Sequence, residues 1–228
     1  MIKKAQAGDA ASQNFLAMMY ISGEGVPKDF SQAMNWFGKA AEQGSAEAQY
    51  NLAVMYERGE GVKPSCDDAV KWYSRAAQQR FAPAIDNLLA MRQSGICLKQ
   101  DDKEIATLTK QLAELGRPWA RSNLGTYYAM GRGVEKNEAE AGRWFALAAE
   151  AGDPTAQWML GQWYRDGRGK IERNWVTAYK WFTIAVASGS QMDGRNFLKG
   201  KMSSEEIFAA EQQAQQWIQA HPVASRSK

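Results

Sequence analysis

The chain has 228 residues, of which 45% are hydrophobic and 23% are charged, and its formal net charge is +3. This apolar content can build a sizeable core, so folding needs neither a metal nor a disulfide framework. The basic residues are scattered among almost as many acidic ones, and no apolar run approaches the roughly 18 residues of a membrane-spanning helix. Composition therefore argues against nucleic-acid binding and against direct membrane insertion.

A period of 36 residues runs through the sequence. Five leucines share this spacing: Leu16, Leu52, Leu88, Leu124 and Leu160. Four tryptophans follow a second register, the last of them one residue late: Trp36, Trp72, Trp144 and Trp181. Such a period is typical of a solenoid in which each unit is covered by its neighbours. Each unit has the pattern of two short helices joined by a glycine loop, so we predict an all-α solenoid of antiparallel helix pairs.

The predicted units follow one another along the chain. Residues 1–8 align with the end of a unit, so we expect the natural protein to extend further toward its N-terminus. The later segments are five repeats, a C-terminal cap and a disordered tail, at 9–44, 45–80, 81–116, 117–152, 153–189, 190–220 and 221–228. In the first unit Gly23 and Gly25 end the first helix, because glycine enters left-handed conformations without a steric cost.

The unit at 81–116 keeps its length but loses most of the recurring residues. Arg92 replaces the tyrosine, Cys97 replaces the second loop glycine, and Leu108 replaces the tryptophan. Leu88 and Leu108 keep the spacing of a helix pair. We expect this unit to fold as two helices and to bend or loosen the stack.

Two cysteines, Cys66 and Cys97, lie between the helices of neighbouring units. Stacking could bring them together, but two cysteines do not make a disulfide framework and the geometry of a disulfide is demanding. We expect two free thiols rather than a bond. Cytoplasm and periplasm both stay open as compartments, and no targeting segment is recognisable.

The C-terminal cap begins with a helix start signal. Ser203 and Glu206 have the spacing of a capping box, which predicts a helix that continues to about Ala220. The many glutamines of this segment suit the polar outer face that a terminal cap needs.

The residues offer little for catalysis. The single histidine, His221, lies in the predicted tail, which argues against histidine-dependent triads and most zinc sites. Acidic pairs fall at predicted helix starts, where the helix dipole favours them. The loops GEG and GRG follow helices and recur with the repeat, so they end helices rather than bind phosphate. We expect no enzyme activity, no cofactor and no bound metal.

The recurring pattern is A-x-x-x-L-A-x-x-Y-x-x-G-x-G-V, then an aspartate, then A-x-x-W-[FY]-x-x-A-A-E-x-G. It resembles the Sel1-like repeat, a relative of the tetratricopeptide repeat, over residues 1–189 in four good units and one degenerate unit. The resemblance implies a right-handed superhelix of antiparallel helix pairs that works as a non-catalytic adaptor.

By the same resemblance, the concave wall is built from first-helix positions at fixed offsets from the recurring leucine. These positions select the expected partner-binding residues: Asn14, Met18, Ile21, Tyr50, Val54, Glu57, Arg58, Trp119, Ser122, Met130, Trp158, Gln162, Arg165 and Asp166. Tyr50, Trp119 and Trp158 are aromatic at positions where most of the other units have no aromatic residue, and exposed aromatic residues often dominate binding energy. The alternative is that each of them packs against a neighbouring unit or is an ordinary exposed aromatic residue. Trp175, at the start of a second helix, is a weaker candidate for the rim.

Two hypotheses for function follow. The leading one is a monomeric protein-interaction scaffold that binds a peptide or a partner protein in the concave groove. The alternative is a module that binds a glycan or another small ligand, because aromatic faces also stack on sugars. The sequence does not name the partner.

Overall fold

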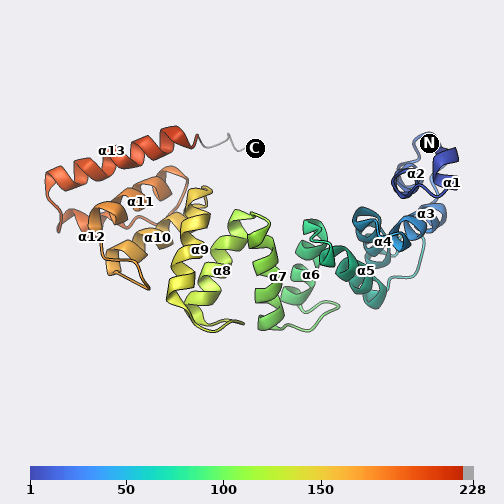
Figure 1. Ribbon diagram of the computed structural model, residues 1–228, viewed down its shortest axis with the longest axis horizontal. Coiled ribbons are helices and arrows are strands. Elements are labelled where there is room, and N and C mark those ends of the chain that lie inside the picture. Colours follow the sequence, from blue (N-terminus) through green and yellow to red (C-terminus); the bar gives the residue numbers. More distant parts are fainter. Residues whose placement is uncertain (223–228) are drawn as a thin grey trace. The chain divides into compact units, whose positions relative to one another are not determined.

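The computed structural model describes residues 1–222, which form helices joined by turns and loops, with no strand in that range (Figure 1). Residues 1–222 contain thirteen helices: α1 (Ile2–Gln6), α2 (Ala10–Ser22), α3 (Phe30–Glu42), α4 (Ala46–Arg58), α5 (Cys66–Gln78), α6 (Ala82–Ser94), α7 (Asp102–Glu114), α8 (Pro118–Met130), α9 (Glu138–Glu150), α10 (Pro154–Asp166), α11 (Trp175–Ala187), α12 (Arg195–Lys199) and α13 (Ser204–Ala220). Within residues 1–222 no helix has both the length and the apolar content to cross a lipid bilayer.

The chain divides into two compact units, Met1–Asp101 with α1 to α6 and Asp102–Lys228 with α7 to α13. Inside each unit, consecutive helices pack against one another, and the tightest pairs are α2 with α3, α4 with α5, α8 with α9, and α10 with α11. These are the helix pairs of the predicted repeats, and the expected all-α solenoid class is confirmed. The division falls inside 81–116, where the sequence departs most from the repeat.

Local signals set the ends of the helices. Asp9 caps the start of α2, the first helix of the first repeat, because its carboxylate accepts a hydrogen bond from the backbone N–H of Ser12 at 2.8 Å. This helix ends at Gly23, which has a φ of 79° in the left-handed region that glycine tolerates. Asp29 caps the start of α3, the second helix of this repeat, and accepts a hydrogen bond from the N–H of Gln32 in the same way. Helices α4, α5, α9, α10 and α11 reuse this plan with serine, aspartate or asparagine as the cap, whereas α6 and α8 follow Phe81 and Arg117, which make no side-chain capping bond.

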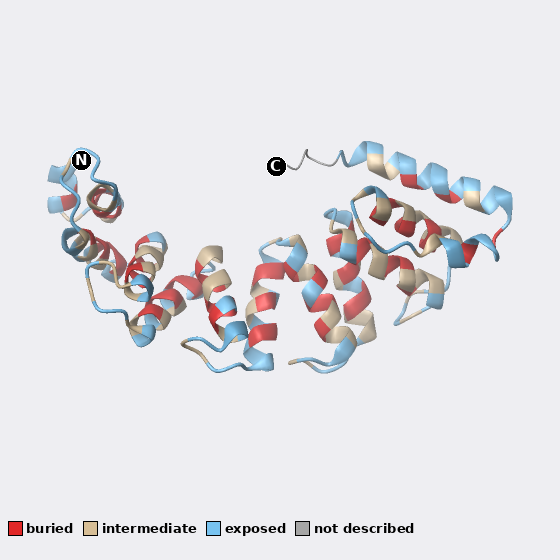
Figure 2. Cartoon of the chain, turned by 180° about the vertical axis from the view of Figure 1, so that it is seen from behind, coloured by how far each residue is buried: buried red, intermediate tan, exposed pale blue. Residues whose placement is uncertain are grey.

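Buried residues gather on the helix faces that meet other helices, while the loops are exposed (Figure 2). Small and large residues alternate there: Ala141, Ala148 and Ala149 let helices approach closely, and Phe145 and Trp163 fill the space between them. The two rings meet edge to face with centroids 5.0 Å apart. A single pair of helices could not cover this apolar surface, which explains the need for stacking.

A repeated hydrogen bond ties every unit except the degenerate one to the unit before it. Gln13, Gln49 and Gln157 are buried, and the side-chain amide of each donates to the carbonyl oxygen eight residues earlier, at 3.0, 3.0 and 3.1 Å. In the fourth unit Arg121 takes this position and donates from Nε at 3.1 Å to the equivalent carbonyl. In the degenerate unit the position holds Ile85, which cannot donate.

Cys66 and Cys97 form a disulfide, so the expectation of two free thiols is wrong. Their Cα atoms are 5.2 Å apart. Cys66 is the first residue of α5, and Cys97 lies in the loop after α6 with a φ of 63°. The bond therefore joins two consecutive repeats inside the unit Met1–Asp101.

The repeat itself explains this disulfide. Gly61 and Gly169 are the counterparts of Cys97, and each lies directly against the first residue of the second helix in the preceding repeat. A Cβ atom at Gly61 would lie 2.8 Å from the carbonyl oxygen of Phe30, and one at Gly169 would lie 2.8 Å from that of Glu138. Phe30 and Glu138 are the counterparts of Cys66. The two cysteines thus occupy positions that the fold brings into contact in every regular repeat.

The C-terminal segment closes the second unit. The predicted capping box of Ser203 and Glu206 is present at the start of α13, which packs against α11. Trp217 of α13 meets the edge of Trp181, with ring centroids 5.8 Å apart, and stacks on His221. His221 and the proline after it are the described part of the predicted disordered tail at 221–228; residues 223–228 lie outside the described range.

Candidate protein-interaction surface

The expected site residues of the first repeats come together between α2 and α4. Met18 and Val54 occupy equivalent positions of consecutive repeats, and with Ile21 and Arg58 they line a cavity of about 110 Å³. Met18 and Arg58 are exposed, and Val54 is half-buried. We call this cavity the α2–α4 pocket. Its apolar residues have an ion pair at their edge, in which Nη1 of Arg58 lies 3.8 Å from Oε1 of Glu60. The size of the cavity suits one side chain.

A second cavity follows between α4 and α6, with a volume of about 210 Å³. We call it the α4–α6 pocket. The expected residue Glu57 lines it, together with Asn87, Met91 and Ile96. The side chain of Ile96 is 67% exposed, which is unusual for an isoleucine. The two pockets lie on either side of α4, so its exposed side belongs to both.

A buried phenol orders the polar side of the α4–α6 pocket. The hydroxyl of Tyr73 donates to Oε2 of Glu57 at 2.6 Å and accepts from Nδ2 of Asn87 at 2.7 Å. Burial raises the pKa of Tyr73 well above its usual value, and the hydrogen bond to Glu57 raises it further. Tyr73 therefore stays protonated and holds both polar side chains in place.

The three expected aromatic residues, Tyr50, Trp119 and Trp158, differ in their surroundings. Tyr50 is half-buried, with its ring centroid 5.7 Å from that of Tyr73 and 5.6 Å from that of Phe81. Trp158 is half-buried and packs against the cluster that joins α11, α12 and α13. Trp119, by contrast, is 40% exposed. Neighbouring helices thus account for Tyr50 and Trp158, while Trp119 has an open face.

The other expected residues of the second unit also differ in accessibility. Ser122 is buried and Met130 is 72% exposed at the end of α8. Gln162 and Arg165 are half-buried on α10. Arg165 binds the neighbouring Asp166 through Nε at 2.6 Å, and this hydrogen bond lowers the pKa of that carboxyl. Of these side chains, Met130 is the most available to a partner.

In the first unit, Asn14 is also buried, and its Oδ1 accepts Nδ2 of Asn51 from the next repeat at 3.3 Å. Asn14 therefore supports the α2–α4 pocket instead of lining it. Asn51 itself lines that pocket and was not among the expected residues. A period could have indicated it, because Asn51, Asn87 and Asn123 are 36 residues apart.

The structure adds exposed apolar residues that the sequence analysis did not select. Phe15 is 50% exposed on α2, Phe197 is 55% exposed on α12, and Phe208 is 63% exposed on α13. Phe197 lies 5.4 Å below the guanidinium of Arg165. No periodic signal marks Phe197 or Phe208, because both follow the last repeat. Within the described residues, no group of three or more histidine, cysteine or acidic side chains could hold a metal ion.

Comparison with known proteins gives the family. The model of the Sel1 repeat matches four segments, at 10–45, 46–81, 120–153 and 154–190, which together make up more than half of the chain. The chain is a Sel1 repeat protein. Sel1 repeat proteins are generally scaffolds for protein–protein interaction and typically lack catalysis. The resemblance read from the sequence is confirmed, and residues 82–119, which hold the degenerate repeat, are not matched.

Solved structures agree with this assignment. A protective antigen of uropathogenic Escherichia coli strains with an SLR fold is 29% identical, with a TM-score of 0.69, over 95% of this chain. This chain spans only 47% of the length of that antigen. A Sel1 repeat protein from Oxalobacter formigenes is 31% identical, with a TM-score of 0.64, over 92% of this chain and 88% of its own. The comparison with curated proteins found no match.

Proposed function

We propose that this Sel1 repeat protein is a non-catalytic scaffold that binds a peptide or partner protein along the first helices of the unit Met1–Asp101. The observation that carries the proposal is the α2–α4 pocket. Met18, Val54 and Arg58 come from two repeats, were selected by offsets that the family resemblance implies, and line one cavity. Glu57 lines the next cavity, on the other side of α4.

The chemistry of these pockets suits an extended peptide. Each has an apolar wall with polar groups at its edge: Arg58 and Glu60 at the first, Glu57 and Asn87 at the second. Protein interfaces combine an apolar centre with a polar rim in this way, and methionine adapts its shape to different partners. Volumes of about 110 and 210 Å³ hold single side chains, whereas cofactor and drug-like ligands use pockets of roughly 300–1,000 Å³.

The glycan hypothesis has less support. Stacking on a sugar ring needs an open aromatic face, and Tyr50 and Trp158 pack against neighbouring helices. Trp119 alone keeps such a face among the three. A flat tryptophan fluorescence response to glycan fragments would agree with the protein-binding proposal, and a saturable change lost in Trp119→Ala would contradict it.

Partner capture by matched variants tests the proposal. Met18→Lys and Arg58→Glu change the edge of the α2–α4 pocket at exposed positions, so the fold is expected to survive. Gln78→Lys changes an exposed residue of α5 and serves as the control. We expect proteins that the unmodified chain and Gln78→Lys both retain from source-cell extract to be lost from the double variant. Equal retention by all three chains would contradict the site.

A further inference from the structure

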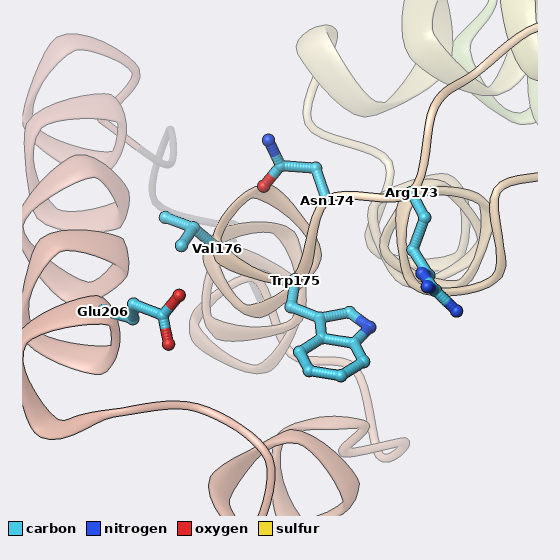
Figure 3. Close-up of a pocket in the computed structure, with 5 residues that line it drawn as sticks. All are labelled: Arg173, Asn174, Trp175, Val176 and Glu206. Atoms are coloured by element: carbon cyan, nitrogen blue, oxygen red, sulfur yellow. The ribbon is translucent and has the colours of Figure 1, made fainter.

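A third cavity lies in the second unit, away from the pockets described above. Its volume is about 400 Å³, and Figure 3 shows its lining residues. They come from the loop before α11, from the first residues of α11 and from the start of α13: Arg173, Asn174, Trp175, Val176 and Glu206. The sequence suggested Trp175 as a weaker candidate for the rim of a binding surface. Its position at this cavity gives it a specific role that can be tested.

The cavity has opposite charges at its two ends. Glu206 lies on one side and Arg173 on the other, with Trp175 and Val176 between them (Figure 3). The guanidinium of Arg173 is 5.7 Å from the centre of the Trp175 ring, and it has no ion pair within residues 1–222. The ammonium of Lys201 lies 6.0 Å from the same ring. The indole side of the cavity therefore has two cations near it.

The carboxylate at the other end is held in place. Oε2 of Glu206 accepts the backbone N–H of Ser203 at 2.8 Å as part of the capping box of α13. This bond fixes the side chain over the cavity, and the structure gives its other oxygen no hydrogen bond to the described part of the chain. Glu206 can therefore accept a hydrogen bond from a cationic group while it caps the helix.

We propose that this cavity binds a peptide segment of a partner protein in which an aromatic or aliphatic side chain lies between a basic and an acidic residue. The apolar side chain would pack on Trp175 and Val176. The basic residue would approach Glu206, and the acidic residue would form a charge-assisted hydrogen bond with Arg173. A segment with two acidic residues would place one of them against Glu206, and a segment with two basic residues would place one of them against Arg173.

Fluorescence anisotropy with labelled, end-capped synthetic peptides tests the proposal. The probe Lys-Ser-Phe-Ser-Asp is compared with one that has two lysines, one that has two aspartates, and one in which alanine replaces phenylalanine. Because Arg173 and Glu206 are exposed, we expect the mixed-charge probe to bind about two- to fivefold tighter than either like-charge probe. Loss of the aromatic ring is expected to weaken binding by about tenfold. Equal binding of all four probes, or no binding of any, would overturn the proposal.

Single substitutions assign each end of the cavity. Glu206→Gln keeps an oxygen for the N–H of Ser203 but removes the charge, so it should abolish the preference for the mixed-charge probe over the di-aspartate probe. Arg173→Gln should abolish the preference over the di-lysine probe. Lys110→Gln and Glu135→Gln, at exposed positions elsewhere in the same unit, should change neither preference.

The same variants define the results that would contradict the assignment. A uniform loss of affinity for all probes in Glu206→Gln, with an unchanged melting temperature, would show that the charge does not select the peptide. If free phenylalanine bound as tightly as the mixed-charge probe, the occupant of the cavity would be a small zwitterion and not a peptide. Either result would overturn the proposal.

Discussion

Individual side chains connect neighbouring repeats. The buried glutamines at 13, 49 and 157 each reach back to the last turn of the preceding helix. Hydrophobic packing alone would tolerate sliding between helices, whereas a hydrogen bond to one carbonyl fixes the position. These glutamines therefore help to fix how each repeat is placed on the one before it.

Gln157→Leu tests this role. The side chain keeps a similar volume but loses the donor to the carbonyl oxygen of Ala149, which retains the N–H of Gly152. We expect the free energy of unfolding to fall by about 1 kcal/mol, measured by urea denaturation. Gln219→Leu on the exposed side of α13 is the control. An unchanged or higher stability in Gln157→Leu would show that the bond is dispensable.

Tyr73 predicts an alkaline dependence of stability. Burial and the bond to Glu57 raise the pKa of Tyr73 in the folded chain, while the unfolded chain keeps a value near 10.0. The folded state therefore retains a proton that the unfolded state releases above about pH 10. We expect stability to be independent of this group below pH 10 and to fall above it. Tyr73→Phe should show a shallower alkaline decline in thermal melts, and an identical decline would contradict the assignment.

At the scale of an element, the loop after α6 departs from the repeat in one decisive residue. Cys97 occupies a position with a φ of 63°, where the regular repeats have glycine. A non-glycine residue in this region costs roughly 1–2 kcal/mol. The disulfide to Cys66 offsets this cost and joins the degenerate repeat to a regular one.

Two substitutions separate the backbone effect from the covalent bond. Cys97→Ser and Cys97→Gly both remove the disulfide, which closes a loop of 31 residues and contributes about 3–4 kcal/mol in the chain-entropy account. Cys97→Gly also restores the residue that the loop conformation favours. We expect it to lose about 1 kcal/mol less than Cys97→Ser in denaturant melts. A larger loss in the glycine variant would show that the backbone position carries no strain.

Particular residues show how far the sequence could predict this fold and site. The leucine and tryptophan periods predicted the helix pairs, and the spacing of Ser203 and Glu206 predicted the cap, because these signals are local. The disulfide was missed because its explanation lies in the contact between Gly61 and the preceding repeat, which periodicity does not reveal. The packing of Tyr50 on Phe81 also depends on a neighbouring unit, so the position of Tyr50 within its own repeat could not predict how exposed its side chain is.

At the scale of the whole molecule, the two compact units differ in how they are stabilised. Met1–Asp101 contains the disulfide, while Asp102–Lys228 ends in the packing of α13 on α11. In repeat proteins a local change spreads mainly to adjacent repeats. Stability should therefore respond differently in the two units when the bond is reduced.

Hydrogen exchange with and without a reductant measures this difference. We expect reduction to speed exchange in α4, α5 and α6 and to leave α10, α11 and α13 unchanged, because only the first unit contains the disulfide. The Cys66→Ser variant should show the fast pattern without reductant and no further change with it. Equal acceleration along the whole chain would contradict the view that the bond acts locally.

Site-specific photo-crosslinking tests the scaffold proposal most directly. A photoreactive phenylalanine analogue is placed at residue 54, in the α2–α4 pocket, and in a second chain at residue 78, on the exposed side of α5. The proposal predicts that crosslinks to a partner protein form from residue 54, are absent from residue 78, and disappear when Met18→Lys and Arg58→Glu are added. Crosslinks of equal yield from both positions, or crosslinks from residue 78 alone, would contradict it.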